Sequence, residues 1–165
     1  MNSKKLFWLA GPITWIAYTK KVSPKPPFIK YKGPNMKETE EFAGKLLTIA
    51  GESVVVPYAD EELCALFVKK AKPTMYKKKK LTRTNIRNCH ESVSRLWLKK
   101  PEVYTIYTGY ALSADDVWRR HSWILTKEKI LIEPTEKREM YMGIKLSPHR
   151  AKQFAKVYTE DEDDF

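Results

Sequence analysis

The chain has 165 residues, the size of one ordinary domain, and is long enough to bury about two thirds of its unfolded surface. Hydrophobic residues at 42% and aromatic residues at 12% supply a compact core and exclude a mostly disordered protein. Two cysteines, neither in a CxxC pair, exclude a disulfide scaffold and a zinc ribbon, so we expect a reducing, cytoplasmic location.

The formal net charge of +11 is unevenly distributed along the chain. Seven lysines fall between Lys69 and Lys80, whereas residues 159–165, TEDEDDF, are predicted to form a disordered acidic tail. We therefore expect one domain over residues 1–158. The excess of basic residues favours acidic partners, such as nucleic acid or acidic proteins, through long-range electrostatic steering.

The first 21 residues combine a basic start with an apolar run that Gly11 and Pro12 interrupt. The run is too short to cross a membrane, and no small-x-small cleavage site follows it. We therefore expect two strands joined at the Gly-Pro pair, with no export signal and no membrane partner. The prolines within residues 22–37 predict an extended connector.

Further regular elements are predicted from residue 38 onward. Residues 38–49 place apolar side chains at helical spacing, and SVVVPY at 53–58 is typical of a buried strand. Residues 61–71 predict a second helix, capped by Asp60, whose apolar stripe makes Cys64 a core residue. We expect KPTMYKKKKLTR at 72–83 to be a solvated basic loop or the lead-in to a helix.

The pattern changes in the second half of the chain. Apolar side chains at helical spacing predict a helix that begins at Cys89 and stops before Pro101. Four segments rich in β-branched and aromatic residues follow and predict an antiparallel sheet. They span residues 102–112, 121–126, 129–135 and 138–146. A last helix is expected from a Ser147 cap to about Val157.

Cys89 has the position of a nucleophile, because a helix N-terminus lowers the pKa of a thiol. His90 follows it directly, and a helix turns about 100° per residue, so the His90 ring is expected to point away from the thiol. His121 and Glu133 are better placed. A hairpin centred on Lys127 pairs these two residues on one face of the sheet, with Cβ atoms about 5 Å apart.

The order of these residues resembles that of a known family. Cys89 at a helix start is followed by TGY at 108–110, HSW at 121–123 and EPT at 133–135. This resembles the transglutaminase-like branch of the papain-type cysteine hydrolases. The resemblance implies an α+β, papain-like fold with the cysteine helix packed on an antiparallel sheet. It also implies a nucleophile at Cys89, a general base at His121 and an orienting carboxylate at Glu133.

An enzyme of this kind transfers the acyl group of a protein or peptide amide through a thioester, without a cofactor. Peptidase, amidase, deamidase and transglutaminase activities would share the triad, and an acidic substrate suits the charge of the chain. The family commonly has Asp where this chain has Glu133, and the glutamine that precedes the cysteine has no match here. We therefore expect the oxyanion donors to be the Cys89 N–H with Asn88 or Asn85.

Other interpretations remain open from the sequence. Cys89 can be a buried structural thiol, or it can join His90, His121 and Glu133 in a metal site, although adjacent Cys and His rarely bind one ion and we expect no metal. Trp118, in a polar stretch, is expected to overhang the cleft and to contact substrate together with Tyr110.

The rival function is a basic nucleic-acid-binding protein with a non-catalytic papain-like fold. It would use the stretch from Lys69 to Arg87, in which Tyr76 can stack on a base. The cations expected to neutralise phosphates or an acidic partner are Lys77, Lys78, Lys79, Lys80 and Arg83.

Overall fold

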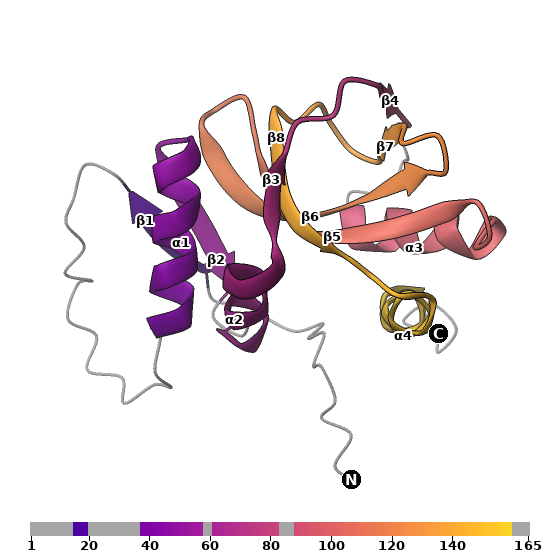
Figure 1. Ribbon diagram of the computed structural model, residues 1–165, viewed down its shortest axis with the longest axis horizontal. Coiled ribbons are helices and arrows are strands. Elements are labelled where there is room, and N and C mark those ends of the chain that lie inside the picture. The colour runs from indigo at the N-terminus through magenta and orange to yellow at the C-terminus, as the bar shows by residue number, and fades with distance from the viewer. Residues whose placement is uncertain (1–14, 20–36, 58–60, 83–87, 160–165) are drawn as a thin grey trace, which may run out of the picture.

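The computed structural model describes residues 15–19, 37–57, 61–82 and 88–159 (Figure 1). This part of the chain is an α+β fold with four helices and one mixed sheet of eight strands. The elements are β1 Trp15–Thr19, α1 Lys37–Ile49, β2 Ser53–Pro57, α2 Glu61–Lys70, β3 Lys72–Thr74, β4 Lys79–Leu81, α3 Cys89–Lys99, β5 Tyr104–Leu112, β6 Val117–Thr126, β7 Leu131–Glu133, β8 Met140–Lys145 and α4 Pro148–Thr159.

The long strands β5 and β6 form the centre of the sheet, whose order is β1-β2-β6-β5-β8-β3. The four strands β5 to β8 pair antiparallel wherever they meet, which confirms the prediction for these segments. The sheet as a whole is mixed, because β2 runs parallel to β6 and β4 runs parallel to β7. Along one edge of β6, residues 117–119 pair with β2 and residues 124–125 pair with β7.

The two faces of the sheet differ in what covers them. Alternate side chains of β5 point to the helices: Ile106 packs with α3 and α4, and Tyr110 and Leu112 pack with α1 and α2. Figure 1 shows α1 and α2 at one end of the sheet and α3 and α4 at the other. The intervening Ala111 packs on the other face, in an aromatic cluster with Trp123, Leu131 and Tyr141. The period of two along each strand therefore separates the helix-covered face from the aromatic face.

Two glycines let the central strands approach closely. A Cβ added at Gly109 would lie 2.1 Å from the carbonyl oxygen of Met142, and one at Gly143 would lie 2.5 Å from that of Thr108. Both contacts are far inside van der Waals distance. Glycine at these positions therefore allows β5 and β8 to pack without displacing the backbone.

Most predicted elements are confirmed, with shifts at their ends. The helix predicted from Cys89 begins there, Cys64 is fully buried in the core, and the last helix extends to Thr159. The prediction for residues 72–83 was wrong, since they contain strands β3 and β4. Of the two expected N-terminal strands, β1 is present.

Several predictions concern residues outside those that the structure describes: the Gly-Pro junction, the proline connector, the Asp60 cap and the acidic tail beyond Thr159. Among the helices of the described residues, none is both long enough and apolar enough to span a membrane.

Candidate active site

The thiol of Cys89 lies at the first residue of α3. Asn88 caps this helix from an extended conformation, and its Oδ1 accepts a hydrogen bond from the backbone N–H of His90 at 3.0 Å. The cap fixes the start of the helix at Cys89. The partly buried thiol therefore lies at the positive end of the helix dipole.

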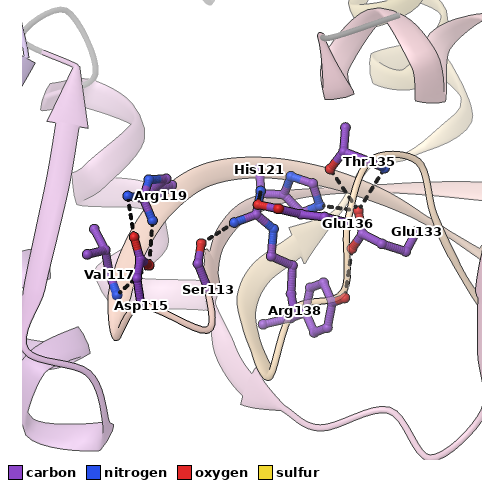
Figure 2. Close-up of polar contacts among 10 residues, drawn as sticks. Ser113, Asp115, Val117, Arg119, His121, Glu133, Thr135, Glu136 and Arg138 are labelled. Atoms are coloured by element: carbon purple, nitrogen blue, oxygen red, sulfur yellow. Dashed lines mark hydrogen bonds and ion pairs between the residues drawn. The ribbon is translucent and has the colours of Figure 1, made fainter. Parts of the chain in front are cut away.

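His121 and Glu133 form a buried pair on the aromatic face of the sheet. Nε2 of His121 lies 2.8 Å from Oε1 of Glu133, and the two residues are only 1% and 2% exposed (Figure 2). The prediction that these side chains share a face and meet is confirmed. Because Nε2 contacts the carboxylate, Nδ1 is the ring nitrogen that remains for the thiol.

The register that joins the pair differs from the predicted one by two residues. Leu125 pairs with Leu131, and the three-residue turn is centred on Glu128, where Lys129 has a positive φ of 60°. His121 and Glu133 are therefore diagonal neighbours rather than directly opposite. A shift of two keeps both side chains on the same face, and the additional methylene of glutamate helps to span the diagonal.

The buried carboxylate of Glu133 accepts hydrogen bonds from three residues. Besides His121, Tyr141 donates from its hydroxyl to Oε2 at 2.7 Å, and Thr135 donates to Oε1 from its N–H and hydroxyl, both at 3.3 Å. Figure 2 shows Thr135 and His121 directed toward the carboxylate. These donors offset the cost of burying the carboxylate and hold it against the imidazole.

Both histidines interact with the Cys89 thiol, so the prediction that the His90 ring points away was wrong. Burial raises the pKa of Cys89, but the charges of His90 and His121, with hydrogen bonds to both rings, hold that pKa well below its usual range. Burial lowers the pKa of His121, but the charge of Cys89 and hydrogen bonds to Cys89 and Glu133 raise it to about 9. The opposite directions favour a thiolate beside an imidazolium.

The orientation of the His90 ring depends on its neighbours rather than on the helix alone. Nδ1 of His90 lies 2.7 Å from the hydroxyl of Ser122, which itself donates to Thr108 at 2.9 Å. The ring also packs against Phe154 and Tyr158 of α4, with centroids 5.8 and 4.9 Å away. Ser122 follows His121 in β6, so the two side chains point to opposite faces: Ser122 holds the ring of His90, and His121 supplies the other ring.

The predicted substrate contacts do not fit the structure. Trp118 and Tyr110 are fully buried in the core under α1 and α2, and Nε1 of Trp118 donates to the carbonyl of Ala50 at 2.8 Å. The polar stretch that suggested a loop at Trp118 belongs to β6, where alternate residues face the helices. Asp115 occupies the preceding turn and pairs with Arg119 at 2.7 Å (Figure 2).

The predicted oxyanion donors are only partly described. Asn88 uses Oδ1 as the cap, which leaves its side-chain N–H₂ as the group able to donate. Asn85 lies outside the described residues.

The lysines of the basic stretch are exposed but are not a uniform solvated loop. Lys77, Lys78, Lys79 and Lys80 all lie at the surface, and the last two belong to β4. Nζ of Lys79 donates to the carbonyl of Arg138 at 2.8 Å and lies 5.5 Å from the ring centre of Tyr141. Arg83 lies outside the described residues.

Within the described residues, no group of three or more His, Cys, Asp or Glu side chains is arranged to hold a metal ion. No protein-family model, curated protein or solved structure matches the chain.

Proposed function

We propose that the chain is a cysteine-dependent acyl-transfer enzyme that acts on a protein or peptide amide through Cys89, His121 and Glu133. One observation carries the proposal. A thiol at a helix N-terminus interacts with an imidazole whose other nitrogen is held at 2.8 Å by a buried carboxylate. Nucleophile, base and orienting acid are the three groups that this chemistry requires.

The reaction begins with attack of the Cys89 thiolate on the carbonyl carbon of the amide, which gives a tetrahedral oxyanion. The His121 imidazolium then gives its proton to the leaving nitrogen as the carbon–nitrogen bond breaks. A thioester remains on Cys89. Water, or an amine, gives a proton to His121 and attacks the thioester, which releases the acyl product and restores the thiolate–imidazolium pair.

Glu133 supports the imidazolium throughout this cycle. Its Oε1 accepts from Nε2 of His121, which directs Nδ1 toward the sulfur and stabilises the positive charge on the ring. Tyr141 and Thr135 hold the carboxylate in place. His90 adds a second imidazole beside the sulfur, and its role is to stabilise the thiolate rather than to move the proton.

The oxyanion is stabilised at the start of α3. The N–H of Cys89 is one of the first helical N–H groups, which have no acceptor within the helix. The side-chain N–H₂ of Asn88 is adjacent and supplies the second donor in this proposal. The helix dipole favours negative charge at the same point.

The order of a cysteine helix, a histidine strand and an acid strand within an α+β fold supports assignment to the transglutaminase-like, papain-type enzymes. Cys89 starts α3, His121 lies in β6, and Glu133 ends β7. The net charge of +11 suits acidic substrates. Two free cysteines suit a reducing compartment such as the cytoplasm.

The first test is the reactivity of the thiols. Iodoacetamide at mildly acidic pH should alkylate Cys89 much faster than Cys64, because Cys64 is fully buried in the core and Cys89 is held as a thiolate. Mass mapping of the peptides separates the two sites. Equal rates, or faster labelling of Cys64, would remove the nucleophile assignment.

The second test is capture of the acyl-enzyme. The protein is incubated with a library of peptide and protein amides and quenched in acid, and the mass added to the Cys89 peptide is measured. Addition of an amine then shows whether the acyl group passes to water or to nitrogen. Cys89→Ala is the control and should carry no acyl group. A library that leaves no acyl group on Cys89, although the thiol is alkylated rapidly, would contradict amide chemistry.

A further inference from the structure

A concave site lies where the aromatic face of the sheet meets α2 and α4, and Cys89 is not among its lining residues. It is a pocket of about 350 Å³ toward the β3–β8 edge. Its apolar walls come from Tyr76, Tyr107 and Trp123. The triad chemistry proposed above uses none of these side chains.

The rings of this pocket belong to a stacked row. His121 lies against Trp123 with an angle of 17° between the rings, and Trp123 lies against Tyr107 with an angle of 19°. Trp123 is buried, whereas Tyr107 and Tyr76 are partly exposed. One face of Tyr107 is covered by Trp123, so a planar group that enters the pocket extends the row on the other face.

The charged groups of the pocket have a single sign. Lys70, Lys72, Lys145 and Arg150 come from α2, β3, β8 and α4, and no carboxylate is among the lining residues. Within the described residues, none of the four forms an ion pair with a carboxylate. Four cations that converge from four elements favour a ligand with more than one negative charge.

Polar groups at the walls can orient such a ligand. Tyr76 accepts a hydrogen bond from Nε1 of Trp123 at 3.2 Å, which leaves its own hydroxyl proton to donate. Burial raises the pKa of Tyr76 and of Tyr107, so both hydroxyls stay protonated at neutral pH. The edge strand β3 contains Pro73, which has no N–H, so this edge is poorly suited to pairing with an added peptide strand.

We propose that this pocket binds a nucleoside phosphate group, either as a free nucleotide or as one unit of a single-stranded nucleic acid. The base stacks on the outer face of Tyr107, and the phosphate lies among the four cations. Aromatic stacking combined with phosphate neutralisation is how proteins hold single strands. The site is distinct from the exposed run Lys77 to Lys80, and it does not depend on the acyl-transfer chemistry.

The experiment measures the binding of three probes by fluorescence anisotropy or calorimetry over a range of salt concentrations. The probes are adenosine monophosphate, a single-stranded oligoadenylate and an acidic peptide of matched charge. The test variant is Lys72→Ala/Lys145→Ala, and the control is Lys77→Ala/Lys78→Ala. All four lysines are exposed and the two variants lose equal charge, so folding and net charge are matched.

The pocket variant should bind oligoadenylate roughly tenfold more weakly than the parent and reduce the slope of log affinity against log salt by about 1 to 2. The control should change affinity about twofold or less, because its lysines lie outside the pocket. Binding of the monophosphate with the same lysine dependence identifies a free-nucleotide site, and binding of the oligonucleotide alone identifies a strand site. Tyr107→Phe should retain binding, and Tyr107→Ala should weaken it.

Three results would overturn the proposal. Equal losses in the pocket and control variants would show diffuse charge attraction. An acidic peptide that binds as tightly as the oligonucleotide, with the same dependence on Lys72 and Lys145, would show that the pocket recognises negative charge and not a nucleobase. Absence of binding to both nucleotide probes would reject the site. Because every measurement is of binding, these results are independent of whether Cys89 carries out acyl transfer.

Discussion

Glu133→Gln tests the proposed support of the imidazolium most directly. Glutamine keeps the size of the side chain and an oxygen that can accept from Nε2 of His121. Its amide nitrogen faces the hydroxyl of Tyr141, which can accept a hydrogen bond in place of donating one. The substitution therefore removes the negative charge while leaving the hydrogen-bonded arrangement available.

The size of the effect follows from the pKa of His121. Its rise from 6.5 to about 9 corresponds to about 3 kcal/mol in favour of the imidazolium. Burial opposes this preference, whereas the charge of Cys89 and hydrogen bonds to Cys89 and Glu133 favour it, together with the charge of Glu133. We expect the Glu133 charge to contribute about 1.4 kcal/mol, which is tenfold in the protonation equilibrium. Loss of ring orientation adds to this, so kcat/KM should fall about ten- to a thousandfold.

The sign of the pH dependence is fixed by the same shift. The imidazolium of the folded protein is present at low and neutral pH and is lost as the pH rises through about 9. Without the Glu133 charge it is lost at a lower pH. The alkaline limb of the kcat/KM profile should therefore move down by about one pH unit in Glu133→Gln.

The assay combines the pH profile of turnover with NMR titration of the His121 ring, which needs no substrate. The matched control is Glu136→Gln. Glu136 is 66% exposed at its side chain and pairs with Arg138, so the same chemical change there should leave both measurements unaltered. An unchanged alkaline limb together with full kcat/KM in Glu133→Gln would refute the support that we assign to the carboxylate.

Three further predictions concern the site and the sheet. Cys89→Ala and His121→Ala should each remove nearly all turnover. The double variant should be little slower than either single variant in single-turnover assays, because the two residues act as a unit. A double variant whose loss of rate equals the product of the two single losses would contradict this. His90→Ala should raise the pH midpoint for alkylation of Cys89 and reduce turnover by about tenfold, since one of the two imidazoles that lower the pKa of the thiol is lost. A loss as complete as that of His121→Ala would point to a different centre. Gly109→Ala should lower the free energy of unfolding by about 2 kcal/mol or more in chemical denaturation, because the added Cβ would lie 2.1 Å from a backbone oxygen. The control is Gly44→Ala in α1, where the added Cβ meets open space, and it should raise the free energy of unfolding by about 0.5 to 1 kcal/mol.

Local chemistry explains which parts of the site could be predicted from the sequence. The start of α3 followed from polar residues before an apolar helical pattern, and the shared face of His121 and Glu133 followed from the period of two along strands. The exact register did not follow. It depends on a left-handed residue, Lys129, in a turn without glycine, which the sequence does not signal.

The rest of the site depends on contacts between distant segments. His90 was excluded because helical geometry fixes only the direction of its Cβ, whereas the ring position is set by Ser122 and α4. The neighbouring Ser122 in the HSW segment was the available signal. Strands β3 and β4 are short and basic, and their pairing with β8 and β7 has no local signature.

The two imidazoles beside Cys89 both depend on β6. His121 is a residue of this strand, and the ring of His90 is held by the hydroxyl of the next residue, Ser122. The low pKa of the thiol therefore belongs to the native state alone and disappears when β6 separates from α3. Unfolding exposes the sulfur fully, yet it restores an ordinary thiol pKa. At mildly acidic pH, Cys89 thus becomes less reactive toward alkylating agents as the chain unfolds, so its labelling rate reports the fraction of folded molecules.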